Sequence, residues 1–168
     1  MKNQMMKTTM TKKTRIINHY YQPTGNTCGP ACIFMAQQSI KNPDSIIDKS
    51  KADFMIEEIS ELCETDWIVG TPPERMSKGM RALGLKFVEY QSSPRPYDLL
   101  KETINNGNVP IIRTITQGVP HWIIIEGYSD TSYDVLDPWL GVITYNESEL
   151  DLIWSPRDYQ FYEVLNYL

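Results

Sequence analysis

The chain has 168 residues, of which 41% are hydrophobic and 22% are charged, and its formal net charge is −5. This length fits one globular domain with a real hydrophobic core, and the acidic balance argues against a broad nucleic-acid-binding surface. No apolar run approaches the roughly 18 residues of a membrane span. Three unevenly spaced cysteines do not form a disulfide framework. We therefore expect a reducing compartment, the cytoplasm, with export by a signal-less route as the alternative.

The N-terminal part of the chain predicts a tail followed by helices. Residues 1–15 are rich in Lys, Thr and Met and lack the apolar core of a signal peptide. We expect them to be a flexible tail before a single domain over residues 16–168. Apolar residues at helical spacing predict helices over residues 28–40 and about 43–64. The run Thr-Pro-Pro-Glu at 71–74 is typical of a capping box and predicts a third helix that ends at Gly84.

The second half of the chain has the pattern of an antiparallel sheet. Runs of β-branched and aromatic residues, separated by Gly, Pro, Asp and Ser, predict strands. These strands cover residues 85–90, 109–115, 121–127, 133–137, 141–144 and 159–165, with short helices over 97–106 and 146–154. Helices followed by antiparallel strands indicate an α+β domain of two layers.

Cys28 is the candidate nucleophile. It lies at the predicted start of the first helix, in the run Gln-Pro-Thr-Gly-Asn-Thr-Cys-Gly-Pro-Ala at 22–31. A helix N-terminus carries about half a positive elementary charge, which favours the reactive thiolate over the thiol. An inert packed cysteine is the alternative, and it is the preferred interpretation for Cys32 and Cys63. A zinc site is disfavoured because no pair of Cys or His residues has zinc-finger spacing.

His121 and Asp137 are the candidate partners of this thiol. A hairpin whose turn centres on Ser129 places these two residues directly opposite each other on adjacent strands. Opposed residues share a face of the sheet, with Cβ atoms about 4.5–5.5 Å apart, so that an imidazole and a carboxylate can touch. A slip of one residue would put them on opposite faces. The alternatives are a half-buried structural histidine and an aspartate that only forms an Asp-Pro turn.

These residues suffice for nucleophilic catalysis on an amide. Asp137 would orient the His121 ring, whose second nitrogen would hold an ion pair with the Cys28 thiolate. The backbone N–H of Cys28 and the side-chain amide of Gln22 would stabilise the developing oxyanion.

Two further residues are predicted to contact the substrate. Gly29 would leave the approach to the sulfur open, and Trp139 would lie beside the site and shield the His–Asp hydrogen bond from water. Core packing is the alternative for Trp139, and a plain loop amide is the alternative for Gln22.

The combined motifs resemble the papain-like cysteine peptidases, and above all the family that removes double-glycine leaders from bacteriocin precursors, with its stand-alone relatives. The shared motifs are Gln22, Cys-Gly-Pro-Ala at 28–31, His-Trp at 121–122 and Asp-Pro-Trp at 137–139. The resemblance covers about residues 20–168 and implies a papain-like fold, with a helical half packed on an antiparallel sheet. It assigns the nucleophile to Cys28, the base to His121, the orienting role to Asp137 and the oxyanion contact to Gln22.

The resemblance implies a bacterial cysteine peptidase that needs no metal or organic cofactor and acts on a peptide or protein substrate. The same scaffold also carries protein-glutamine deamidases and acyl transferases of the effector or toxin type, for which an immunity protein or a target protein would be the partner. A catalytically silent peptide-binding domain is the alternative outside the enzymes.

Overall fold

The structure is a computed structural model, and it describes residues 11–167. Its helices are α1 (Cys28–Lys41), α2 (Lys49–Cys63), α3 (Pro73–Ala82), α4 (Pro96–Asn105) and α5 (Glu147–Trp154), the last followed by a 3₁₀ turn, η1 (Ser155–Arg157). Its strands are β1 (Lys12–Lys13), β2 (Phe87–Tyr90), β3 (Val109–Thr116), β4 (Val119–Tyr128), β5 (Tyr133–Asp137), β6 (Gly141–Tyr145) and β7 (Phe161–Val164). The predicted α+β fold, with the N-terminal helices packed on an antiparallel sheet, is confirmed.

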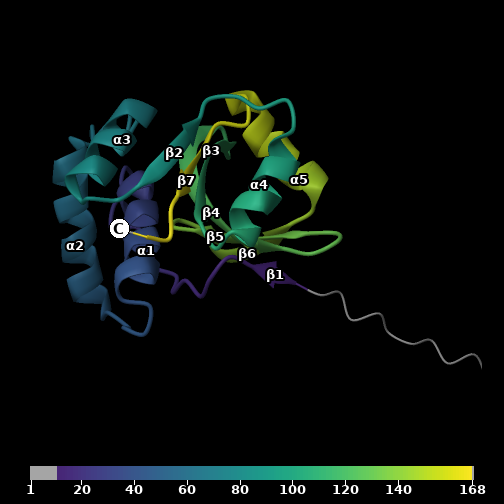
Figure 1. Ribbon diagram of the computed structural model, residues 1–168. Coiled ribbons are helices and arrows are strands. Elements are labelled where there is room, and N and C mark those ends of the chain that lie inside the picture. The colour runs from purple at the N-terminus through teal and green to yellow at the C-terminus, as the bar shows by residue number, and fades with distance from the viewer. Residues whose placement is uncertain (1–10, 168) are drawn as a thin grey trace, which may run out of the picture.

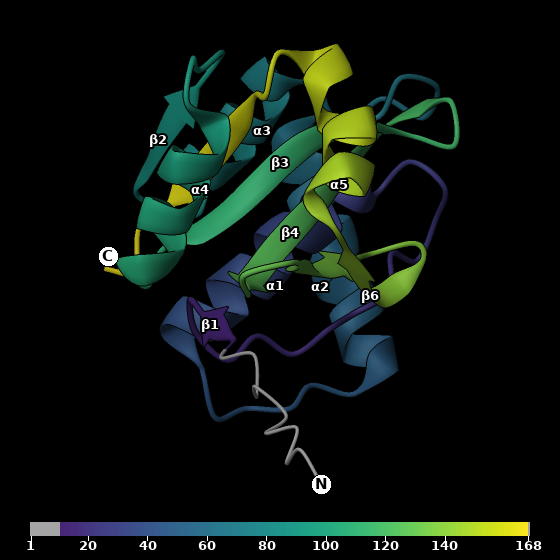
Figure 2. The same cartoon turned by 90° about the vertical axis from the view of Figure 1, so that its right-hand side faces the viewer.

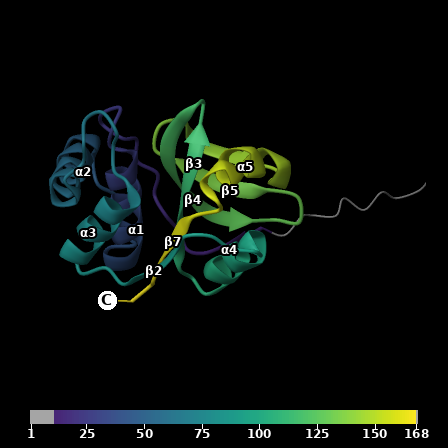
Figure 3. The same cartoon turned by 90° about the horizontal axis from the view of Figure 1, so that it is seen from above.

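The sheet has seven strands in the order β2-β7-β3-β4-β5-β6, with β1 added beside β4, and all neighbouring strands are antiparallel (Figure 1). Helices α1, α2 and α3 cover one face, whereas α4 and α5 cover the other (Figure 3). Alternate residues of the central strands enter a separate hydrophobic cluster on each face. Helix α1 lies innermost among its neighbours, and its residues 28–39 are all buried.

The second predicted helix is shorter than expected. Helix α2 begins at Lys49, because the Asp48 side chain caps it by accepting a hydrogen bond from the Lys51 N–H at 3.0 Å. Residues 42–48 form a turn and an irregular segment instead, consistent with the Asn42-Pro43 stop signal.

The capping box predicted at residues 71–74 is wrong. Helix α3 begins at Pro73, and its N-cap residue, Pro72, makes no side-chain capping bond. The Thr71 hydroxyl instead contacts the Thr65 hydroxyl at 2.8 Å and closes the α2–α3 loop. The predicted end of the helix is confirmed, since Gly84 follows it with a left-handed φ of +72°.

The predicted flexible tail is wrong for its last residues. Strand β1 pairs with the end of β4, where Lys13 lies opposite Gly127 (Figure 2). The Arg15 guanidinium donates a hydrogen bond to the Ser39 carbonyl near the end of α1 at 2.7 Å. Residues 1–10 of the predicted tail lie outside the described residues. Among residues 11–167, no helix combines the length and the apolar character that a membrane crossing requires.

Gly29 allows α1 and α3 to approach each other closely. A Cβ atom at this position would lie 2.6 Å from the Met76 sulfur and 3.1 Å from the Thr71 Cβ atom. Both neighbours are buried, so neither can move into solvent. The glycine therefore serves the packing of the helical layer.

We expect Gly29→Ala to lower the free energy of unfolding by about 1–2 kcal/mol, since overpacking costs roughly 1–3 kcal/mol and the gain in helix propensity offsets part of it. Urea denaturation followed by circular dichroism measures this change. Gly25→Ala is the matched control, because a Cβ atom at position 25 meets no atom within 4 Å. Equal stability of the two variants would show that the close approach at Gly29 has no energetic weight.

Candidate active site

A cleft of about 750 Å³ opens where the N-terminus of α1 meets the sheet. The α2–α3 loop, the β3–β4 hairpin and the turn between β5 and β6 form its walls. Four of the predicted site residues line it, namely Gln22, Cys28, His121 and Trp139. The helix start and the end of the sheet, which are distant in the chain, thus share one cavity.

Cys28 is the first residue of α1 and is 7% exposed. The preceding Thr27 is buried, and its hydroxyl donates to the Thr24 carbonyl at 3.1 Å, which shapes the turn that leads into the helix. The N–H groups of a first helical turn have no acceptor within the helix. The Cys28 sulfur therefore lies beside donors that can bind negative charge.

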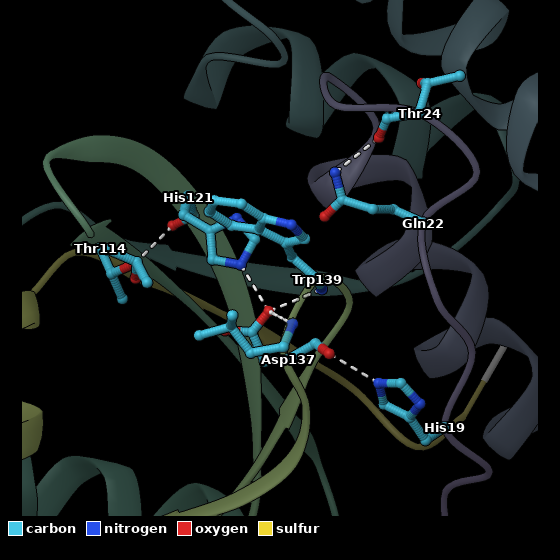
Figure 4. Close-up of polar contacts among 9 residues, drawn as sticks. His19, Gln22, Thr24, Thr114, His121, Asp137 and Trp139 are labelled. Atoms are coloured by element: carbon cyan, nitrogen blue, oxygen red, sulfur yellow. Dashed lines mark hydrogen bonds and ion pairs between the residues drawn. The ribbon is translucent and has the colours of Figure 1, made fainter.

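His121 and Asp137 contact each other directly. His121 Nε2–H donates to Asp137 Oδ1 at 2.7 Å, and both side chains are buried (Figure 4). The same oxygen accepts the backbone N–H groups of Trp139 at 2.8 Å and Leu140 at 3.0 Å. The two interpretations of Asp137, histidine partner and turn former, are therefore both realised through one oxygen atom.

The register that brings these residues together differs from the prediction. Leu136 lies opposite Ile124, so by extension Asp137 falls opposite Ile123, two residues from His121. The prediction of direct opposition is wrong. His121 and Asp137 are instead diagonal neighbours on one face, a separation that long side chains can bridge.

A bulge in β4 determines this register. Next to the turn, Gly127 pairs with Asp134, a register that would place His121 and Asp137 on opposite faces if it continued. The pairing shifts by one residue between Ile125 and Gly127, and this shift returns the two side chains to a common face. The one-residue bulge at this point is thus a condition of the His–Asp contact.

The N-terminal segment binds the bulged residue, Glu126. The Thr14 N–H donates to the Glu126 carbonyl at 2.9 Å, and the Lys13 ammonium pairs with the buried Glu126 carboxylate. The hydrogen bond that the Lys13 ammonium donates to the Glu126 carboxylate raises the pKa of Lys13. No sequence pattern indicated the bulge or its partner segment.

The electrostatics of the site favour a charged histidine. Burial lowers the pKa of His121, but the hydrogen bond to Asp137 and the interaction with Cys28 outweigh burial and raise it to about 9. Burial likewise raises the pKa of Asp137, yet His121 and the N–H groups of Leu140 and Trp139 hold it below its ordinary value. At neutral pH the ring is therefore an imidazolium between a carboxylate and the Cys28 sulfur.

The segment that leads into α1 runs behind the aspartate. The His19 ring donates from Nε2 to the Asp137 carbonyl at 2.7 Å (Figure 4). The Gln22 N–H donates to the Pro138 carbonyl at 2.8 Å. The Gln22 side-chain amide donates to the Thr24 carbonyl at 2.7 Å, which leaves its second hydrogen for another acceptor. The contact between His19 and Asp137 is one that the sequence analysis missed.

The two predicted substrate contacts have different positions. Trp139 is 48% exposed, lines the cleft and meets the His121 ring edge to face, with centroids 6.1 Å apart. Gly29 is buried and does not belong to the cleft lining, so the prediction that it keeps the approach to the sulfur open is wrong. Trp122 is a packing residue whose indole N–H donates to the Thr71 carbonyl at 2.8 Å.

The other cysteines are buried in the helical layer. Burial raises the pKa of Cys32 well above its ordinary value, with the nearby charges of Cys28 and Asp137 acting in the same direction. Burial also raises the pKa of Cys63 to about 12. Both thiols are therefore poor nucleophiles. Within residues 11–167, no three side chains of His, Cys, Asp or Glu converge as metal ligands.

The model of the Peptidase C39 family matches residues 16–157, which is most of the chain. The chain belongs to the Peptidase C39 family. This family consists of cysteine peptidases. No curated protein matches the sequence.

Solved structures with the same fold include other members of this family. The peptidase domain of Streptococcus ComA, a bifunctional ABC transporter involved in quorum sensing, superposes with a TM-score of 0.68 at 16% identity, covering 89% of this chain and 98% of that one. A double-glycine-motif protease from an AMS/PCAT transporter, solved with a leader peptide, gives 0.66 at 16% identity over 89% and 91%. A C39-like peptidase from Bacillus anthracis gives 0.65 at 12% identity over 93% and 98%. At sequence identities of 12–16%, these comparisons show that the fold is shared.

Titration of the histidine rings tests the electrostatics of this C39 site. The chain contains two histidines, so a His19→Asn variant assigns both ring signals in ¹⁵N NMR spectra. We expect His121 to titrate near pH 9, and to titrate lower in both Asp137→Asn and Cys28→Ser, because each change removes an interaction that raises its pKa. Titration near the ordinary value of 6.5 in the native chain would contradict the ion-pair geometry.

The same shift makes the stability of the fold depend on pH. The folded-state pKa of His121, about 9, exceeds its ordinary value of 6.5. Its stabilising contribution is therefore complete below about pH 6.5 and is lost as the pH rises through about 9. His121→Ala should remove this part of the pH dependence from urea denaturation curves.

Proposed function

We propose that this C39 family member cleaves a peptide through a covalent acyl-enzyme on Cys28, with His121 as acid and base and Asp137 as the orienting group. The observation that supports this best is the 2.7 Å hydrogen bond between His121 and Asp137 at a cleft that Cys28 also lines. A domain that only binds peptides has no need of an imidazolium placed between a thiol and a carboxylate.

The reaction begins with the ion pair between the Cys28 thiolate and the His121 imidazolium. The sulfur attacks the carbonyl carbon of the scissile amide, and a carbon–sulfur bond forms as negative charge moves to the carbonyl oxygen. His121 then gives its proton to the departing amine, and the carbon–nitrogen bond breaks. In the second half, His121 takes a proton from water, which attacks the thioester and releases the acid product. Asp137 keeps the ring in one tautomer and stabilises its charged form throughout.

The oxyanion is bound by two donors near the sulfur. The Cys28 N–H belongs to the first turn of α1, where it has no helical acceptor. The Gln22 side chain lines the same cleft and donates one amide hydrogen to the Thr24 carbonyl, so that its second hydrogen is the one proposed to bind the oxyanion. Both contacts strengthen as negative charge develops on the substrate oxygen.

The substrate class is a peptide. The cleft has a volume of about 750 Å³, and its lining includes the exposed apolar residues Trp67, Ile68 and Val69. Two hydrogen bonds from the N–H groups of Ile68 and Val69 to the Asp66 carboxylate hold this loop in shape. The similar double-glycine-motif protease that was solved with a leader peptide supports a peptide as the ligand.

Incubation with a peptide digest of a bacterial proteome, followed by mass spectrometry, tests this reaction. We expect new peptide ends with the native chain, none with Cys28→Ser, and a rate about 10²- to 10⁴-fold lower with Asp137→Asn, which keeps the turn but favours the wrong histidine tautomer. Cys63→Ala removes a thiol outside the cleft and should retain activity. A mass gain of about 1 Da without cleavage would show that the activity is glutamine deamidation and not peptide cleavage.

Replacement of Gln22 tests the oxyanion contact separately. We expect Gln22→Ala to reduce kcat by about 10²- to 10³-fold with little change in KM, because the contact strengthens only as charge develops. Alkylation of Cys28 by iodoacetamide at neutral pH should stay as fast as in the native chain, since that reaction forms no oxyanion. An unchanged kcat would remove Gln22 from the mechanism.

A further inference from the structure

The active-site cleft contains an arginine that the reaction does not use. Arg113 lies in β3 directly opposite Trp122 of β4, and the next residue, Thr114, lies opposite His121. The Arg113 side chain is half-buried and lines the cleft. It therefore belongs to the same cavity as the nucleophile but comes from the neighbouring strand.

The charge in this cleft has the opposite sign to that of the whole chain. The chain carries a net charge of −5, yet no Asp or Glu is present among the described residues that line the cleft. Arg113 is the permanent charge of that lining, because a guanidinium does not lose its proton in proteins. A peptide that enters the cleft therefore meets a fixed cation and no fixed anion.

Most of the donors of Arg113 have no acid to bind. Nη1 donates to the Gln160 side-chain oxygen at 3.0 Å, a neutral acceptor. Within residues 11–167, no carboxylate oxygen lies within the 4.0 Å of an ion pair with Arg113. A guanidinium has five N–H donors arranged as a fork that matches a carboxylate. The fork of Arg113 is held on one side by Gln160 and is available on the other.

A second arginine lies behind the first. Arg157 ends the turn η1, which packs beside β3, and its Nε atom is buried without a hydrogen-bond partner. Burial and the charge of Arg157 both lower the pKa of Arg113, while Glu74 acts in the opposite direction without reaching ion-pair distance. Burying two cations without a paired anion raises the free energy of the folded protein. The binding of an anionic ligand would offset this cost.

We propose that Arg113, supported by the positive charge of Arg157, binds a carboxylate of the peptide substrate and selects acidic sequences for cleavage. This inference rests on the proposed peptidase function and adds a specificity-determining residue to it. The carboxylate comes either from an Asp or Glu side chain or from the C-terminus of the peptide, and the fork geometry accepts both.

The specificity profile of the cleaved peptides tests the proposal. In the proteome digest, we expect the native chain to cut mainly peptides that carry an acidic group, at the same distance from the cleaved bond in each peptide. Arg113→Met should lose this enrichment and raise KM for an acidic peptide by about 10- to 100-fold, with a smaller change in kcat. Arg95→Met is the matched control, since Arg95 pairs with Asp98 outside the cleft and its loss should leave the profile unchanged.

Synthetic peptides distinguish the two sources of the carboxylate. Replacing the preferred Glu by Gln should raise KM if a side chain is bound, whereas amidation of the C-terminus should raise it if the chain end is bound. Arg113→Glu should invert the preference and favour the same peptide with Lys in place of Glu. Charge reversal of this kind requires direct contact, because a structural role of Arg113 would not depend on the charge of the peptide.

The possible failures are separable. If native chain cuts nothing, the proposed function fails, and if it cuts peptides without an acidic preference, only the role of Arg113 is overturned. Circular dichroism reports whether Arg113→Met folds. If it does not, Arg113→Lys keeps the charge, loses the fork and should still raise KM for the acidic peptide, and an unchanged KM in this variant would also overturn the proposal.

Discussion

The site depends on a shift of one residue in the pairing of two strands. The turn between β4 and β5 alone would put the His121 and Asp137 side chains on opposite faces, and the bulge at Glu126 puts them on the same face. Strand β1 and Thr14 bind the chain at this bulge. The His–Asp contact is therefore connected, through Glu126, to a segment more than a hundred residues earlier in the sequence.

Asp137 joins several parts of the cleft. One of its side-chain oxygens binds the His121 ring and two backbone N–H groups of the following turn, while its carbonyl oxygen accepts the His19 ring. The adjacent Pro138 carbonyl binds the Gln22 N–H. The turn that orients the histidine thus also positions the segment that carries Gln22 and leads to Cys28. A change in this turn therefore acts on the His121 ring and on the Gln22 segment together.

The local structural positions of the candidate site residues were more predictable than their arrangement in space. The positions of Cys28 at a helix start and Asp137 before a proline are local properties, and helix termini and Asp-Pro turns have recognisable sequence signals. The β4–β5 register was predicted wrongly for two reasons: the turn centres between Asp130 and Thr131 and not on Ser129, and the bulge has no such signal. Gly29 was assigned to the substrate site, although its neighbours Met76 and Thr71 explain it by packing. Arg113 was missed because a single arginine in a strand does not indicate which cavity it faces.

The sequence by itself determined the α+β class, the order of most helices and strands, and the residue types available for thiol chemistry. These follow from hydrophobic periodicity, from caps and turns, and from motifs a few residues long. The tertiary structure decided that Cys28, His121 and Gln22 share a cleft and that Arg113 lies in it as well. It decided this because strand register, helix packing and the pairing of β1 with β4 are set by contacts between residues far apart in the chain, which no local pattern encodes.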